Sequence, residues 1–258
     1  MGARFLPIYR RELKSYLTSP AFYVAVAIFF FLTGLVFCGI LLSFSEMSGN
    51  AEYRKEMGFE EINFTRHVVS QVFWSTNFFL MFVVPILTMR LIAEEKRTGT
   101  YEVLTSLPFT DWNIVLGKFL AAYTLVALMQ AGSAYYAFIM IRFGTPELPV
   151  MAVAFVGGLV VAAAYVAIGL FASSLTESQI VAAILGFVLL LVFYLMSDVI
   201  PGTATGVGKI VEHLSLRYHS EQFTHGLLRL EDIAYFLMMV GAFLFLTCRS
   251  LEIRRWKI

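Results

Sequence analysis

The chain has 258 residues and a formal net charge of +1; 59% of its residues are hydrophobic and only 14% are charged. An ordinary soluble domain contains about 25% charged residues, so this composition excludes a soluble globular protein and indicates an integral membrane protein. The length allows one membrane domain and leaves no room for a folded soluble domain beside it.

Residues 1–20 precede the first apolar segment and have a helical pattern of their own. Apolar and aromatic side chains recur there at helical spacing: Leu6, Tyr9, Leu13, Tyr16 and Leu17. Arg10, Arg11 and Lys14 fall on the other face. This pattern predicts a basic amphipathic helix that lies in the membrane interface, followed by a membrane domain over residues 21–258. The alternative is a flanking anchor that binds no partner.

Six apolar segments are predicted to cross the membrane. A hydrocarbon core about 30 Å thick requires about 20 apolar residues in a helix, and unpaired backbone groups are not tolerated there. The predicted spans are residues 22–44, 72–89, 119–141, 151–175, 180–197 and 233–248. The sixth is short, and snorkelling of Arg249 together with helix tilt can extend it. We therefore predict an all-α membrane protein with six transmembrane helices.

The distribution of charge predicts the orientation of the six spans. Twelve of the 19 Lys and Arg residues lie on the side of the two termini, and seven lie in the opposite loops. The acidic residues divide the other way, seven against eleven. Because loops on the cytoplasmic side have the excess of Lys and Arg, both termini are expected in the cytoplasm.

A dense block of charged residues, 94–102, separates the second predicted span from the third. It lies only a few residues from hydrocarbon on either side, so it must form a tight loop at the membrane surface. The helix of the second span can continue through Arg97 before Gly99 breaks it. Thr100 can then cap a short helix with Glu102 in its first turn, where the helix dipole favours an acid. Leu104 lies on the apolar side of this short helix.

Pro108 is predicted to end the short helix before the third span begins. Asp111 is then expected to cap the third span, and Lys118 is expected to snorkel toward the membrane surface. The result is a short surface helix, cytoplasmic by the orientation above and held between two spans. The alternative is that residues 94–102 form only a solvated turn.

The fourth predicted span is rich in small residues. Gly158 with Ala162 and Gly169 with Ser173 form small-xxx-small pairs, which let neighbouring helices approach closely. Packing within the chain is the commoner explanation of such pairs, and a subunit interface is the alternative.

Residues 200–232 form the longest segment outside the predicted spans, on the side opposite the termini. Their mixed polar and apolar pattern predicts partial helices on or dipping into that face. His213, His219 and His225 are spaced six apart, which directs them to different faces of a helix. They are therefore expected to be solvated loop side chains and not metal ligands.

Two enzyme motifs that the sequence partly resembles are incomplete. Residues 206–209 do not form a phosphate loop, because Thr203 stands where the first Gly is required. The pair Glu94 and Glu95 lacks the Arg that proteases of prenylated proteins need four residues later, where Gly99 stands. No span contains an ionisable residue well inside it, which argues against proton relays and ion-coupled transport. No enzymatic activity is expected.

Residues 94–105, followed by Pro108 and residues 115–118, resemble the loop of type-2 ABC exporter permeases. The six-span layout, the amphipathic N-terminal helix and the long last outer loop are similar too. Residues 214–226 and 232–256 resemble the gliding-motility-type permease branch, to which the copper-associated permeases of nitrous oxide reductase maturation are near neighbours.

The resemblance implies a division of labour between chains. The permease hydrolyses nothing and binds no cofactor, whereas ATP and Mg²⁺ are bound by separate cytoplasmic ATP-binding-cassette ATPase subunits. Two permease chains, identical or different, form the pathway in the bacterial cytoplasmic (inner) membrane, and no nucleic-acid partner is expected. Residues 94–107 would be the coupling helix that sits in a groove of the ATPase, and the N-terminal helix would be the connecting helix beside it.

The resemblance also assigns contact residues. Those expected at the ATPase are Glu94, Glu95, Arg97, Gly99, Thr100, Glu102 and Leu104. The connecting helix would contribute Arg10, Arg11 and Lys14. An alternative function is a non-transporting subunit that transmits mechanical work to a periplasmic envelope partner through residues 200–232.

Overall fold

The computed structural model describes residues 5–49, 64–100, 110–199 and 206–255. These residues are almost entirely helical and include no strand. Within them, six helical segments are long and apolar enough to cross a membrane. The predicted all-α architecture with six spans is therefore confirmed.

Short breaks divide two of the six segments, so eight helices build them. They are α2 (Pro20–Gly49), α4 (Ser70–Thr88) with α5 (Arg90–Arg97), α7 (Asp111–Gly132) with α8 (Ala134–Phe143), α9 (Leu148–Leu175), α10 (Gln179–Val199) and α13 (Leu230–Arg255). The remaining described elements are α1 (Leu6–Leu17), the π-helical turn η1 (Thr65–Val69), α11 (Gly206–His213) and α12 (Leu216–Thr224).

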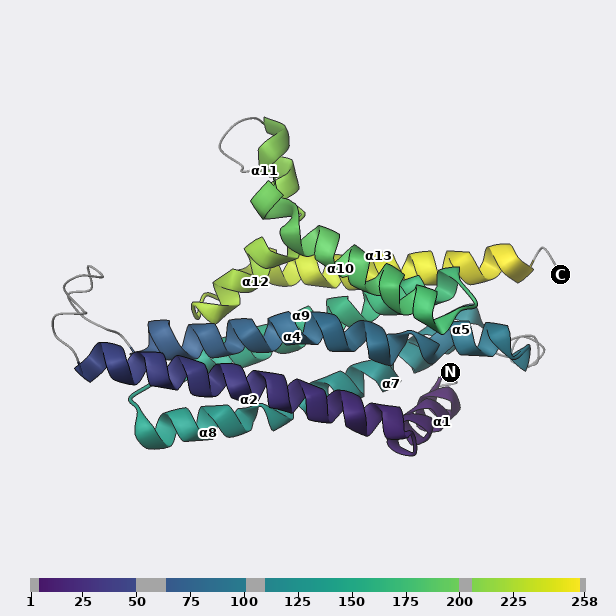
Figure 1. The fold of residues 1–258 in the computed structure, drawn as a ribbon. Coiled ribbons are helices and arrows are strands. Elements are labelled where there is room, and N and C mark those ends of the chain that lie inside the picture. The colour runs from purple at the N-terminus through teal and green to yellow at the C-terminus, as the bar shows by residue number, and fades with distance from the viewer. Residues whose placement is uncertain (1–4, 50–63, 101–109, 200–205, 256–258) are drawn as a thin grey trace.

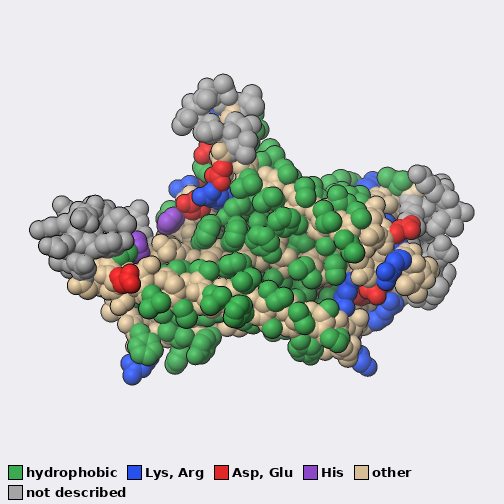
Figure 2. Space-filling view, viewed as in Figure 1, with side chains coloured by type: hydrophobic (Ala, Val, Ile, Leu, Met, Phe, Trp, Pro, Cys, Tyr) green, Lys and Arg blue, Asp and Glu red, His purple; other side chains and the backbone are tan. Residues whose placement is uncertain are grey.

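The long helices run side by side, and both ends of the chain lie at the same end of the bundle (Figure 1). We call this the terminal end; α1 and α5 lie there. α12 lies toward the opposite end, and α11 projects away from the bundle. On the face drawn in Figure 2, hydrophobic side chains cover the middle of the bundle and charged side chains gather toward its ends. This is the distribution that a bilayer requires.

Two helices extend beyond the predicted spans. α13 continues past the end of the sixth predicted span at residue 248 and includes Arg249 and Glu252, which form an ion pair of 2.6 Å on its surface. The third span begins at Asp111, and its N-cap is Thr110 and not Asp111 as predicted. Thr110 has the extended backbone that a cap needs, and its hydroxyl accepts a hydrogen bond from the Asn113 amide.

α9 is the central helix of the bundle. It packs against α4, α5, α7, α10, α12 and α13. Its glycines allow these close approaches: a Cβ atom at Gly157 would lie 2.3 Å from Cγ of Phe223, and one at Gly169 would lie 2.2 Å from Oγ1 of Thr88. Close packing within the chain therefore explains these two small residues.

We expect Gly157→Ala to destabilise the protein, because the added methyl group collides with the buried Phe223 ring and must displace α12 from α9. Overpacking of this kind costs about 1–3 kcal/mol. The measurement is the thermal unfolding midpoint in detergent. Gly39→Ala in α2 is the matched control, since nothing lies within 4 Å of its added Cβ; equal midpoints for the two variants would contradict the packing argument.

The expected partial helices on the opposite end are present as α11 and α12. The prediction that the histidines there are solvated is wrong for His219, whose residue is only 5% exposed. It is buried because α12 packs onto α9 and α13. No group of three or more His, Cys, Asp or Glu that could hold a metal ion occurs within the described ranges.

Candidate functional site

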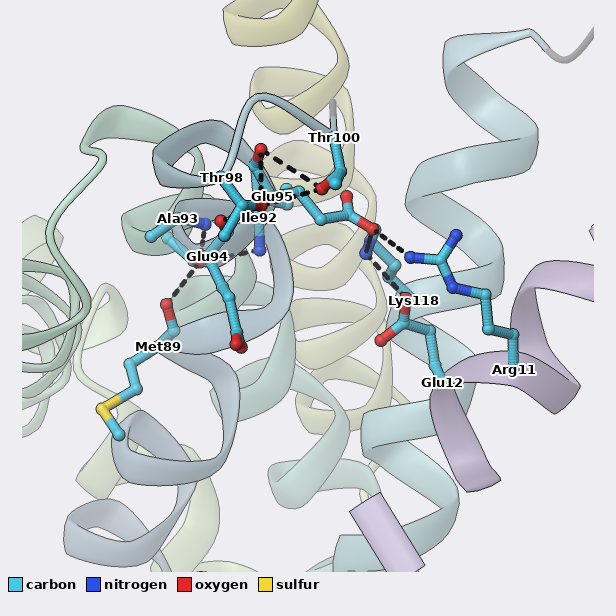
Figure 3. A network of polar contacts seen from close by, with 11 residues as sticks. Arg11, Glu12, Met89, Ile92, Ala93, Glu94, Glu95, Thr98, Thr100 and Lys118 are labelled. Atoms are coloured by element: carbon cyan, nitrogen blue, oxygen red, sulfur yellow. Dashed lines mark hydrogen bonds and ion pairs between the residues drawn. The ribbon is translucent and has the colours of Figure 1, made fainter. Parts of the chain in front are cut away.

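Ion pairs join α1, α5 and α7 at the terminal end of the bundle (Figure 3). The carboxylate oxygen Oε1 of Glu95 lies 2.9 Å from Nζ of Lys118 and 3.2 Å from Nη2 of Arg11. Lys118 also lies 2.9 Å from Oε1 of Glu12. Two carboxylates and two cations from three helices thus form one continuous network, which we call the α1–α5–α7 network.

The centre of this network is buried. Glu95 is 7% exposed and Lys118 is 1% exposed. The prediction that Lys118 snorkels to the surface is wrong, because α1 covers it. Gly117 lets α1 approach this closely, since a Cβ atom there would lie 2.9 Å from Cγ2 of Ile8. Removing one partner from a buried ion pair leaves an uncompensated charge and costs about 3–5 kcal/mol, so the three helices are strongly tied together.

A second set of contacts holds the break between α4 and α5 against α9. The hydroxyl of Ser173 accepts hydrogen bonds from the amides of Ile92 and Ala93, both at 3.1 Å, and donates one to the carbonyl of Met89 at 2.9 Å. Lys96 donates a hydrogen bond to the carbonyl of Ser174. One side chain of α9 therefore bridges the point at which the second span changes into α5; we call this the Ser173 joint.

Tyr16 joins α1 to the same region. Its side chain is buried, and its hydroxyl donates a 2.5 Å hydrogen bond to the carbonyl of Leu87. The guanidinium of Arg90 lies 3.8 Å from the centre of its ring and donates to the hydroxyl of Ser19 at 2.9 Å. Burial raises the pKa of Tyr16, although the nearby Arg90 charge acts in the opposite direction. The phenol therefore stays a neutral donor.

The observed end of α5 is the one predicted from the sequence. The helix extends to Arg97, as predicted, and Gly99 follows with φ +71°, a conformation that favours glycine. The hydroxyl of Thr98 donates to the carbonyl of Glu94 and lies 2.9 Å from the hydroxyl of Thr100. α5 therefore ends in a defined turn where the charged loop begins.

The predicted ATPase-contact residues fall in different environments. Exposed side chains are those of Arg97 and Thr100, and on α1 those of Arg10, Arg11 and Lys14. Glu94 is half-buried, and Glu95 faces inward to the network. Glu102, Leu104 and the short helix predicted after Thr100 lie outside the described residues.

Glu12, Lys118 and Ser173 were not predicted from the sequence to be members of a site. The sequence does contain one indication at Lys118. This lysine lies just inside an apolar segment, and a lysine that is buried by another helix requires a partner for its charge. A polar cavity of about 210 Å³ adjoins the network, lined among others by Arg11, Glu94 and Glu95. The site is therefore a junction of three helices with a polar cavity beside it.

The fold and this junction define a multi-pass, all-α membrane protein whose N-terminal helix is fastened to α5 and α7 by ion pairs. The sequence profile of a family described as ABC-2 family transporter protein matches residues 6–245. The chain therefore belongs to the ABC-2 transporter family and is a membrane permease component of an ABC transporter. Membership implies a membrane context and an ATPase partner. No match was found among curated proteins.

Proposed function

We propose that this chain is the transmembrane subunit of an ATP-binding-cassette exporter and couples ATP hydrolysis by separate cytoplasmic subunits to movement of a substrate across the membrane. ATP and Mg²⁺ bind to those subunits; this chain has no catalytic residue and binds no cofactor. Two permease chains form the pathway in a bacterial inner membrane. The excess of Lys and Arg on the terminal side favours a cytoplasmic location for both termini.

The observation that supports this proposal is the connection of α5 to four other helices. α5 continues the second span toward the charged loop, while Glu95 joins it to α1 and α7 and Ser173 joins it to α9. A displacement of the loop by an ATPase would therefore move several spans together. Such rigid-body transmission is a known form of conformational coupling, and the mixed charge of the loop favours a specific docking register.

The proposal predicts that an ATPase encoded beside this gene co-purifies with the chain and hydrolyses ATP in a permease-dependent manner. The measurement is ATPase activity and substrate flux in vesicles reconstituted with both subunits. The test variant is a chain in which residues 100–107 are replaced by a flexible Gly/Ser linker, which keeps Glu95 and Lys96 in place and should insert normally but lose the ATPase. Undiminished co-purification with the linker variant would contradict the docking role.

A second candidate is a subunit of the gliding-motility type that performs mechanical work on an envelope partner without transport. The attachment of α12 and of the residue that precedes it by two positions favours this candidate. Ser70 donates a hydrogen bond to the carbonyl of Thr224 at the end of α12 at 2.9 Å, and Tyr235 donates one to the carbonyl of Leu214, between α11 and α12, at 2.6 Å. Motion of α4 and α13 would thereby reach this segment. ATP-dependent binding of an outer partner without flux would favour this candidate over export.

A further inference from the structure

Two side-chain amides are buried inside the membrane domain, where α4 and α7 both pack on α9. Asn77 of α4 is 5% exposed, and Gln130 of α7 is fully buried. A Cβ atom at Gly158 of α9 would lie 2.5 Å from Nε2 of Gln130 and 3.2 Å from Oδ1 of Asn77. Because Gly158 has no side chain, both amides can approach the same point on α9.

This point lies deep inside the spans. Asn77 is ten positions from the start of the span His67–Arg97, and Gly158 is ten positions from the start of Leu148–Leu175. At a rise of about 1.5 Å per residue, both lie about 15 Å from the end of the bundle opposite the termini. Gln130 stands three positions before Ser133, where the third span breaks between α7 and α8. The two amides are therefore surrounded by helices at a depth where the bilayer is hydrocarbon.

The polar atoms at this point require a hydrogen-bond partner. In the part of the chain that the structure describes, Oδ1 of Asn77 and both Nε2 and Oε1 of Gln130 are buried and bond to no protein group. An amide without a partner is costly in an apolar environment. Buried polar groups are therefore almost always bonded to protein or to ordered water.

The donors and acceptors indicate what the partner is. Nε2 of Gln130 donates, whereas Oδ1 of Asn77 and Oε1 of Gln130 accept. A metal cation would serve only the two oxygens and an anion only the nitrogen, whereas water both donates and accepts. Since Nε2 and Oδ1 approach the same point, one water molecule can contact both. Internal waters commonly occupy such positions between buried polar groups.

We propose that water is bound inside the membrane domain at Gly158, where it accepts a hydrogen bond from Nε2 of Gln130 and donates one to Oδ1 of Asn77. Further water bonds to Oε1 of Gln130. The site joins α4 to α7 across the surface of α9. Because α4 continues into α5, the bridge connects the span that leads to the charged loop with the third span. The inference does not depend on what, if anything, the protein transports.

The test is solid-state NMR of the full-length chain in lipid bilayers, with nitrogen label in the glutamine side chains and magnetisation transferred from water. Gln130→Met identifies the Gln130 signal by its loss. In the wild type, Gln130 should receive magnetisation from water. In Asn77→Leu, which replaces an amide by an apolar group of similar shape, the transfer should fall several-fold. Gln179 is the internal reference, because it is the first residue of α10 and only half-buried; its transfer should be the same in both proteins.

No transfer to Gln130 in the wild type would overturn the proposal, because a protein group and not water would then satisfy the amide. Undiminished transfer in Asn77→Leu would also overturn it, because the water would not bridge the pair. The wild-type measurement decides between water and protein even if Asn77→Leu does not fold.

Thermal unfolding in detergent provides a second measurement of the bridge. Asn77→Leu and Gln130→Met should each lower the unfolding midpoint, and the double variant should lose no more than the less stable single variant, because either substitution already breaks the bridge. Gln179→Met is the matched control and should unfold close to the wild type. Additive losses in the double variant would show that the two amides are not joined and would overturn the proposal.

Discussion

Glu95→Gln is expected to weaken the attachment of α5 to α1 and α7 and to uncouple ATP hydrolysis from the membrane domain. The substitution removes the charge that faces Lys118 and Arg11 at 2.9 and 3.2 Å. Lys118 keeps Glu12 as a partner, so the expected loss is at the lower end of the range for a broken buried pair, about 3 kcal/mol. The measurements are the unfolding midpoint of the isolated chain and permease-dependent ATPase activity in reconstituted vesicles.

The neighbouring carboxylate provides the control. Glu94 is half-buried and forms no ion pair with the described residues, so Glu94→Gln should leave stability close to that of the wild type. A double substitution separates pairing from other effects: in a Lys118→Met background, Glu95→Gln should cost much less than it does alone. Equal costs in both backgrounds would show that the ion pair does not hold the junction.

The inward position of Glu95 also determines what charge reversal there is expected to do. From the sequence, Glu95 was a surface contact for the ATPase; in the structure its carboxylate points into the protein toward Lys118. Glu95→Lys would bring a third cation to Lys118 and Arg11. We therefore expect it to disrupt the junction itself, in addition to any effect on docking.

The spans were predictable because the thickness of hydrocarbon imposes a length on apolar helices. The helix ends were not, because backbone hydrogen bonding does not stop at the edge of the hydrocarbon. α13 continues through Arg249 and Glu252, and α7 begins in the polar residues at Asp111. Local chemistry did predict the end of α5, since Gly99 can adopt a positive φ without strain.

The junction was less predictable, because it depends on contacts between residues far apart in the sequence. Glu12 and Lys118 are 106 positions apart, and their pairing requires that α1 folds back over α7 at Gly117. His219 was misassigned for a similar reason. Its spacing from the other histidines contains no information about the later helix that supplies Asp232.

Ser173 illustrates the difference between a packing pattern and a specific contact. Its place four residues after Gly169 predicted close approach of helices, and the close approach at Gly169 is observed. The pattern could not indicate that the hydroxyl of Ser173 bonds three backbone groups at the break between α4 and α5. Removing the Ser173 hydroxyl is therefore expected to have a large effect on both stability and coupling.

Ser173→Ala should leave the amides of Ile92 and Ala93 without the acceptor that Ser173 provides, at a site that is fully buried. Each buried polar group left without its partner costs about 1–3 kcal/mol. The expected result is a lower unfolding midpoint together with ATP hydrolysis that no longer drives movement of the spans, because the joint can bend when α5 is displaced. The measurements are thermal unfolding and the ratio of flux to ATP hydrolysed at equal amounts of folded protein.

Ser174→Ala is the matched control for this experiment. Ser174 is equally buried, but among the described residues its hydroxyl bonds only to the carbonyl of Phe171 in its own helix. The contacts that Lys96 and Ser250 make with Ser174 go to its backbone carbonyl, which the substitution keeps. If Ser173→Ala matched Ser174→Ala in both stability and coupling, the three hydrogen bonds of Ser173 would have no specific effect on either quantity. α5 would then transmit its displacement without the Ser173 joint.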